Sequence, residues 1–340
     1  MWNIKFIGID ISKQTLDIYD ENSSKHNKIK NTEKEIKKYF KSVSQTTLIV
    51  YEPTWVYGKK VEKVLNDLNK SHYQIHANDA HLLGKTLVWK NKTDKLDCKM
   101  LVQIAKVMYS NCKEQGGKNK FIKPNSNELN KIQTLLTSIR FMKSEIKKFK
   151  QQLEYCNMTP YSTKQQEKMF HKLIKELETN IRSLEQKIVD IYDSAGLLEK
   201  YQNIQSIPWI WRVTAMELVN FFLFLVNKWF ERWHKKQVVA YAGIHPVAIE
   251  SGSSLNSSKL SKGWKREIKS ALFMVGMQRQ KQYKYEKYTD TTLWKFTKRM
   301  IEKFRNEKNK RGKSVSCAVW KKLLVTAWAL FRDDTQYNFT

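Results

Sequence analysis

The spacing of apolar residues changes once along this chain, near residue 127, and this change constrains the fold more than any other feature. Before it, short strand-like runs such as 4–10 and 46–52 alternate with segments of helical spacing. After it, apolar residues recur every three or four positions from Leu129 to Leu153 and again from Leu173 to Ile191. The pattern predicts an α/β domain followed by two long antiparallel helices with charged outer faces.

The N-terminal pattern is specific enough to predict an order of elements. The predicted strands and helices follow one another along the chain as strands 4–10, 14–20 and 26–30, helix 32–43 with Thr32 as N-cap, strand 46–52, helix 55–69, strand 73–78 and a helix from about residue 93. This order is typical of an α/β domain of the ribonuclease H type. In such a sheet the first and fourth strands are neighbours.

Composition shifts divide the chain into four predicted parts. These are an α/β domain at 1–112, a polar linker with Gly and Pro at 113–126, a helical hairpin at 127–198, and a mainly α-helical domain at 199–340. The hairpin has two interpretations of equal weight. It is either an ordinary hairpin that packs on itself or a protruding coiled coil that joins subunits.

The charge balance predicts a polyanionic partner. Lys and Arg number 62 against 33 Asp and Glu, a formal net charge of +29, and basic side chains bind phosphates with release of counterions. A Lys-rich genome composition also contributes to this excess. The four cysteines are scattered, which predicts neither a zinc site nor a disulfide framework, and the longest apolar run, 221–226, is too short to span a membrane. A cytoplasmic protein is therefore expected.

Four carboxylates stand at the ends of predicted elements. Asp10 and Glu52 end strands, and Asp94 and Asp97, three residues apart, open a helix and share one of its faces. Because neighbouring strands bring Asp10 and Glu52 side by side, the helix is expected to complete an acidic cluster. Converging carboxylates need a hard cation, and Mg²⁺ with its oxygen ligands fits phosphoryl transfer. These four residues are therefore the predicted metal ligands.

Each carboxylate also has a structural interpretation. Asp94 could be a favourable charge at a helix N-terminus, and Glu52 could pair with a lysine. The neighbouring Asp17 and Asp20 are interpreted as solvated turn or edge charges.

Three blocks of the N-terminal half resemble a known family. Residues 8–18, 51–65 and 92–105 are similar to the RuvC-like domain of bacterial insertion-sequence transposases of the DEDD type, serine recombinases related to the Piv invertases. The resemblance implies that Asp10, Glu52, Asp94 and Asp97 form the acidic tetrad. The family block E-x-T-G-x-Y reads here Glu52 to Tyr57 with Trp55 in place of Gly, which removes no ligand.

The C-terminal half supports the same resemblance, and together the blocks cover nearly the whole chain. From composition alone, the Gly/Pro/Ser segment 240–254 is a hydroxyl-rich loop that caps a helix or contacts phosphates. In the family, the serine before Gly in this loop is the nucleophile. The resemblance therefore implies that Ser251 is the nucleophile, with Ser253 as the second choice.

Basic residues follow this loop and are predicted to contact nucleic acid. A solvated helix face is the alternative, but two basic runs in so basic a chain favour phosphate contacts with one stacking ring. The first run consists of Lys259, Lys262, Trp264, Lys265, Arg266 and Lys269, and a second spans 295–313 beside Trp294.

Residues 207–219 have the layout of a helix–hairpin–helix, a motif that grips DNA phosphates through a Gly-containing turn. The family form is rich in Gly there, whereas this chain has Trp209 and Trp211. Bulky rings hinder close backbone approach, so packing or base stacking is the alternative to phosphate gripping.

The resemblance implies a Mg²⁺-dependent transposase that cleaves and rejoins DNA through a covalent serine–DNA intermediate. It further implies a noncoding guide RNA, a homo-oligomer (dimer or tetramer), and a place with the nucleoid in a bacterial cytoplasm. Two other functions stay open: an RuvC-like endonuclease that uses water as nucleophile, and a non-catalytic nucleic-acid-binding protein.

Overall fold

The computed structural model describes residues 4–53, 56–75, 94–114, 124–228, 234–251, 255–260, 266–282, 292–306 and 312–337. The chain forms two compact units. The N-terminal unit comprises Met1–Asn127 with Asn227–Trp229, and the C-terminal unit comprises Glu128–Val226 with Phe230–Thr340. The finer division into four parts stays a prediction.

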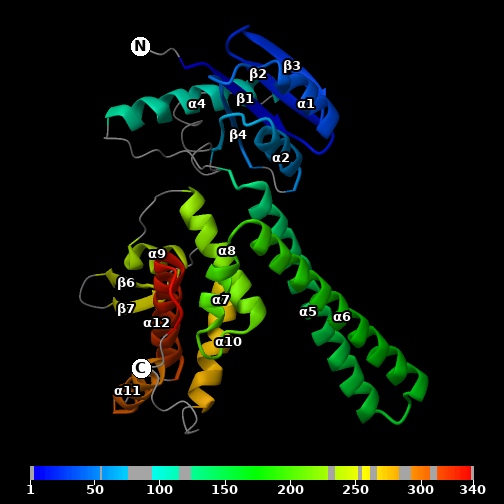
Figure 1. The fold of residues 1–340 in the computed structure, drawn as a ribbon, viewed down its shortest axis with the longest axis vertical. Coiled ribbons are helices and arrows are strands. Elements are labelled where there is room, and N and C mark those ends of the chain that lie inside the picture. Colours follow the sequence, from blue (N-terminus) through cyan, green and yellow to red (C-terminus); the bar gives the residue numbers. More distant parts are fainter. Residues whose placement is uncertain are drawn as a thin grey trace. The chain divides into compact units, whose positions relative to one another are not determined.

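A five-stranded mixed sheet forms the centre of the N-terminal unit (Figure 1). Its strands are β1 (Phe6–Ile11), β2 (Thr15–Asp20), β3 (Lys25–Lys30), β4 (Leu48–Tyr51) and β5 (His72–Gln74). The order is β3-β2-β1-β4-β5, with β1 antiparallel to β2 and parallel to β4. The predicted adjacency of the first and fourth strands is therefore confirmed.

Within the described residues, three helices cover the sheet at the predicted places along the chain. They are α1 (Glu33–Lys41), α2 (Lys59–Asp67) and α4 (Asp94–Glu114). Thr32 caps α1 as predicted, because its hydroxyl accepts a hydrogen bond from the Glu35 amide. The mixed α/β character of this region is confirmed.

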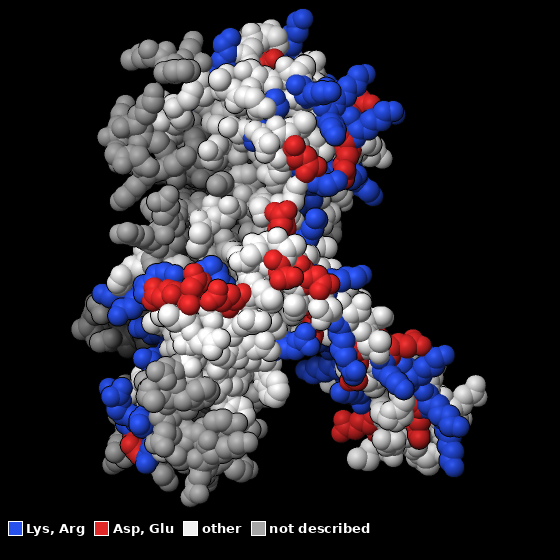
Figure 2. Space-filling model, in the orientation of Figure 1, with Lys and Arg blue, Asp and Glu red and all other residues white. Residues whose placement is uncertain are grey.

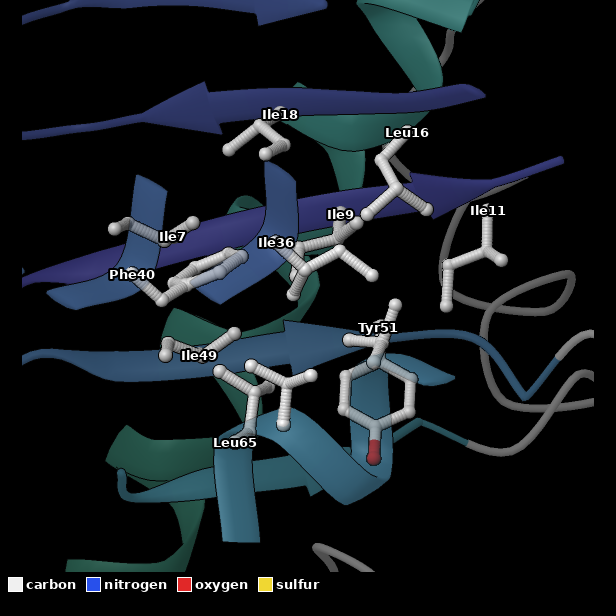
Figure 3. Packing of buried hydrophobic residues seen from close by; sticks show 12 residues of the cluster. Ile7, Ile9, Ile11, Leu16, Ile18, Ile36, Phe40, Ile49, Tyr51 and Leu65 are labelled. Atoms are coloured by element: carbon white, nitrogen blue, oxygen red, sulfur yellow. The ribbon is translucent and has the colours of Figure 1, made fainter. Parts of the chain in front are cut away.

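Alternation along the strands divides the apolar residues between two cores. Ile7, Ile9 and Ile11 of β1 pack with residues of α1 and α2, such as Phe40 and Leu65, on one face of the sheet (Figure 3). On the other face, residues such as Phe6 and Val50 pack against α4. Because both faces are covered, even a polar residue of a central strand becomes enclosed.

A buried polar network lies on the α1/α2 side of β4 and β5. The Tyr51 hydroxyl donates to Nδ1 of His72 across 3.1 Å, and Nε2 of His72 donates to Oδ1 of Asn66 across 2.9 Å. Asn66 in turn donates from Nδ2 to the Asn125 carbonyl, 2.9 Å away. These bonds hold His72 as the neutral imidazole and tie the chain that leads into the next helix to the sheet.

We predict that His72 makes the protein acid-sensitive. Burial lowers the pKa of His72 to about 4, so the unfolded chain binds the extra proton between about pH 6.5 and 4. Stability should therefore fall as the pH is lowered through this window, by about 3 kcal/mol at pH 4. Urea unfolding of the wild type and of His72→Gln at pH 7 and pH 4.5 measures this fall in stability, which should be absent in the variant.

The control variant is His171→Gln, because His171 is exposed in the other unit. It should keep the pH dependence of the wild type. Equal pH dependence in the wild type and in His72→Gln would contradict the prediction.

The C-terminal unit begins with two long helices, α5 (Asn127–Met158) and α6 (Lys164–Ser194). Phe149 and Phe170 meet with ring centroids 6.0 Å apart, and Thr163 forms a capping box with Gln166 at the start of α6. The buried residues of α5 include Leu129, Ile132, Leu136, Ile139 and Ile146, which all belong to the predicted stripe. Two long helices are thus confirmed, while their role as a subunit-joining coiled coil stays a prediction.

The rest of this unit is mostly helical, as predicted. It contains α7 (Leu198–Gln205), α8 (Arg212–Lys228), α9 (Lys235–Tyr241), α10 (Arg266–Gln282), α11 (Thr292–Asn306) and α12 (Gly312–Asp333). The aromatic rings of Phe222, Trp328 and Phe331 pack together between α8 and α12. Among the described residues, no helix is long and apolar enough to cross a membrane.

The segment predicted as a Gly/Pro/Ser loop is in part a β-hairpin. Strands β6 (Pro246–Ser251) and β7 (Leu255–Leu260) pair in antiparallel register. The prediction of a loop was wrong for Pro246–Ser251, because the segment Val247–Ile249 is β-branched at both ends and the cross-strand partner supplies the backbone hydrogen bonds.

Candidate functional site

Asp10 and Glu52 lie at the same edge of the N-terminal sheet. Strands β1 and β4 run parallel with Ile9 opposite Tyr51; Asp10 is the next residue of β1, and Glu52 directly follows the end of β4. Since parallel neighbours end side by side, the pairing predicted from the sequence follows directly from this register.

Helix α4 is brought against this edge by the absence of a side chain at Gly8. A Cβ at Gly8 would lie far inside contact distance of the Cys98 carbonyl oxygen and 3.0 Å from Cγ2 of Val102. Gly8 and Asp10, two residues apart on β1, share the face that α4 covers. Asp97, next to Cys98, is therefore held near the end of the strand that carries Asp10.

The environment of Cys98 shows that carboxylates gather here. Burial, followed by the negative charges of Asp17 and Asp10, raises the pKa of the Cys98 thiol to about 12. The contact of the Cys98 carbonyl with Gly8 places this residue on the face of the sheet that carries Asp10. The start of α4 thus faces Asp10 and a second carboxylate, Asp17.

The prediction that Asp17 is a solvated charge was wrong. Asp17 is only 5% exposed, and it stands directly opposite Asp10 in the β1–β2 ladder. Its Oδ1 lies 3.1 Å from Nε2 of His26 and its Oδ2 lies 3.2 Å from Nζ of Lys28. Because side chains alternate along a strand, Asp17 points to the face of the sheet that Leu16 and Ile18 do not share. That face is buried only because helices cover both sides of the sheet. Asp20 behaves as predicted for a turn, since its carboxylate accepts from the Asn22 amide and the Ser23 hydroxyl.

The carboxylates at this edge match Mg²⁺ in the chemical type of their donor atoms. Asp10, Glu52 and Asp97 offer carboxylate oxygens, the ligands that Mg²⁺ prefers. Asp94 is the first residue of α4, one turn before Asp97, but its side chain lies outside the described part of the chain. Among the side chains that are described, no three acidic, His or Cys groups lie close enough to hold an ion in common.

The candidate nucleophile lies in the C-terminal unit. Ser251 is the last residue of β6 and is paired with Leu255, the first residue of β7. The structure thus describes the backbone of Ser251, but its side chain and the whole of Ser253 lie outside the described residues.

The first basic run is only partly described. Lys259 lies on β7, Arg266 begins α10, and Lys269 is half-buried one turn later. The predicted contacts at Lys262, Trp264 and Lys265 fall outside the described residues.

The second basic run forms part of helix α11. Lys295, Lys298 and Arg299 are exposed there. Lys298 lies 5.2 Å from the Trp294 ring centroid, and Arg299 lies 5.7 Å from that of Phe296. These cations stack on rings of their own helix, which holds them in place at the surface. The long hairpin differs, because Lys and Arg are interspersed there with Asp and Glu (Figure 2).

Residues 207–219, predicted as a helix–hairpin–helix, consist of a short turn and the first part of α8, and α7 precedes them. Trp209 in this turn has a φ of +74°, the left-handed conformation that favours Gly. The backbone thus keeps the form suited to Gly although Trp occupies the position. Trp211 is 63% exposed, which is compatible with stacking on a base.

Residues 201–290 match the Transposase IS116/IS110/IS902 family. The matched segment runs from α7 to beyond α10 and includes the β6–β7 hairpin with Ser251. It covers about a quarter of the chain and does not reach the acidic edge of the sheet. No curated protein matches the chain. The match supports a transposase of the insertion-sequence type, which acts on DNA and recombines it.

Proposed function

We propose that this chain is a Mg²⁺-dependent DNA recombinase that moves an insertion sequence, with an RuvC-like acidic site and a nucleophilic serine. The family match carries the proposal, because it spans the β6–β7 hairpin, whose first strand ends at Ser251. The carboxylates at the edge of the N-terminal sheet add the chemistry. Such groups occur where phosphodiesters are cleaved with the help of a divalent ion.

In this proposal Asp10, Glu52, Asp94 and Asp97 hold the ion. When bound, Mg²⁺ supplies Lewis-acid polarisation of a phosphate oxygen and stabilises the charge that develops on it. The chain's own contribution is to hold the carboxylates at one edge, through the register of β1 with β4 and the close approach of α4 at Gly8.

Ser251 performs the covalent step. Its Oγ attacks the scissile phosphorus, the new P–Oγ bond forms, and the bridging P–O bond to the departing DNA strand breaks. The proton lost by the serine balances the one gained by the departing hydroxyl. A hydroxyl of another DNA strand then reverses the step and rejoins the backbone. Since a phosphodiester is kept throughout, the exchange needs no other source of energy.

The proposal includes partners. The formal net charge of +29 supports binding of polyanions. The DNA partners are the element ends and the target. A noncoding guide RNA would supply sequence recognition by base pairing, and a homo-oligomer, dimer or tetramer, would hold two DNA partners together.

A covalent adduct tests the function. The protein is co-expressed with its native flanking DNA, so that any RNA partner is present, and is then incubated with labelled element-end and target DNA and Mg²⁺. An SDS-stable protein–DNA adduct is expected for the wild type and for Ser253→Ala, and no adduct is expected for Ser251→Ala or Asp10→Asn.

The outcomes separate the alternatives. Cleavage by Ser251→Ala without any adduct in the wild type would establish the endonuclease that uses water. An adduct kept by Ser251→Ala and lost by Ser253→Ala would move the nucleophile to Ser253. DNA binding without cleavage by any form would leave only a nucleic-acid-binding protein.

A further inference from the structure

We propose that Asp17 is a positioning residue of the acidic site, which holds a fixed negative charge beside Asp10 and so strengthens cation binding there. The inference rests on the proposed function, since it concerns the same site. Asp17 is absent from the tetrad that the sequence predicts, and its place became visible only in the folded sheet.

The register of the sheet places Asp17 next to Asp10. The two residues are directly opposite each other on the antiparallel strands β1 and β2, so their Cβ atoms are about 4.5–5.5 Å apart. Asp10 shares its face of β1 with Gly8, and α4 approaches that face at Cys98. Asp17 is therefore enclosed between the sheet and α4 on the side of the acidic edge.

Lys28 and His26 lie next to the Asp17 carboxylate, on the side away from Asp10. Both residues belong to β3, the strand beyond β2, and each contacts a different oxygen, Oδ1 by His26 at 3.1 Å and Oδ2 by Lys28 at 3.2 Å. Lys28 is the direct ladder partner of Asp17. A row Lys28–Asp17–Asp10 thus crosses three strands, and the negative end of the Lys28–Asp17 pair faces Asp10.

This arrangement is unfavourable for the fold alone. Like charges directly opposite on paired strands are destabilising, and a buried ion pair is often no better than apolar residues of the same volume. A cation near Asp10 is attracted by the negative charges of both Asp10 and Asp17. This attraction offsets the repulsion between the two carboxylates. Because both oxygens of Asp17 already face basic groups, Asp17 acts through its charge and through Asp10, not as a ligand.

Binding of Mn²⁺ to the full-length protein, without DNA, tests the inference. Isothermal titration with Mn²⁺ as the probe should give an affinity at least about tenfold weaker for Asp17→Asn than for the wild type, the range found when partners of metal ligands are changed. Lys28→Met should bind a few-fold more tightly, because the opposing positive charge is removed. Asp10→Asn should lose the site.

The opposite signs expected for Asp17→Asn and Lys28→Met exclude a merely structural role. A purely structural pair would change the midpoint of thermal unfolding in both variants and leave the affinity of the folded protein equal. If Asp17→Asn does not fold, Lys28→Met alone decides, and weaker binding in it overturns the inference. Wild-type binding with an unchanged affinity in Asp17→Asn overturns the inference and leaves the proposed function standing. No Mn²⁺ binding by the wild type overturns both.

Discussion

Replacement of Gly8 by Ala should reduce adduct formation at least about 100-fold. The added Cβ would clash with the Cys98 carbonyl oxygen and meet Val102. Because the Cys98 oxygen belongs to the backbone of α4, no side-chain rotation relieves the clash and the helix must shift. A displacement of about 1 Å at a site that depends on positioning reduces rates by about 100-fold. The free energy of unfolding should fall by about 1–3 kcal/mol from overpacking.

A matched variant separates lost position from lost stability. Ile36 of α1 is fully buried on the other face of the sheet, and Ile36→Ala should cost about 2–5 kcal/mol without moving α4. Both variants are assayed for the SDS-stable adduct at a temperature at which circular dichroism shows each to be folded. Adduct formation should survive in Ile36→Ala. Wild-type adduct formation by Gly8→Ala would show that α4 does not help to form the site.

Replacement of Arg140 by Met should strongly destabilise the C-terminal unit. Arg140 of α5 places Nε 3.0 Å from Oε1 of Glu217 on α8 and Nη1 3.4 Å from Oε1 of Glu267 on α10. The Glu217 side chain is only 8% exposed. Removal of the guanidinium takes this ion pair away from a carboxylate that is nearly buried, and breaking such a pair costs about 3–5 kcal/mol. Urea unfolding of the full-length protein measures the loss.

The double variant Arg140→Met with Glu217→Gln tests the cause. It should recover most of the lost stability, because no charge is then left buried. Arg332→Met is the surface control, since Arg332 pairs with the exposed Asp333 and such pairs contribute at most about 1 kcal/mol. A loss in Arg140→Met no larger than in Arg332→Met would contradict the prediction.

Much of the fold follows from local pattern. Thr32 caps α1 and Thr163 caps α6 because a short polar side chain satisfies free amides at a helix start, whatever packs around it. The burial of the apolar stripe from Leu129 to Ile146 could be predicted from its spacing, since the apolar face of a helix packs away from water. The edge shared by Asp10 and Glu52 could be predicted as well, once the order of strands along the chain is recognised.

The β6–β7 hairpin was missed for a different reason. Its strand β6 begins at Pro246 and the hairpin runs through a Gly- and Ser-rich segment, features that favour a loop when a segment is read alone. Pairing with β7 outweighs these preferences. The conformation of Trp209 was missed as well, since nothing in its side chain favours a φ of +74°.

The sequence by itself determined the periods of helix and strand, the helix caps and the ends of strands at which carboxylates stand, because each depends on residues within a few positions of one another. Only the tertiary structure decided that Asp17 is buried opposite Asp10 and that Gly8 admits α4 to the edge of the sheet. The role of Gly8 depends on its contact with Cys98, about 90 residues away along the chain. The burial of Asp17 depends on coverage of its strand from both faces. The physical reason is that periodicity is a property of the chain, whereas close approach and burial are set by which surfaces pack together.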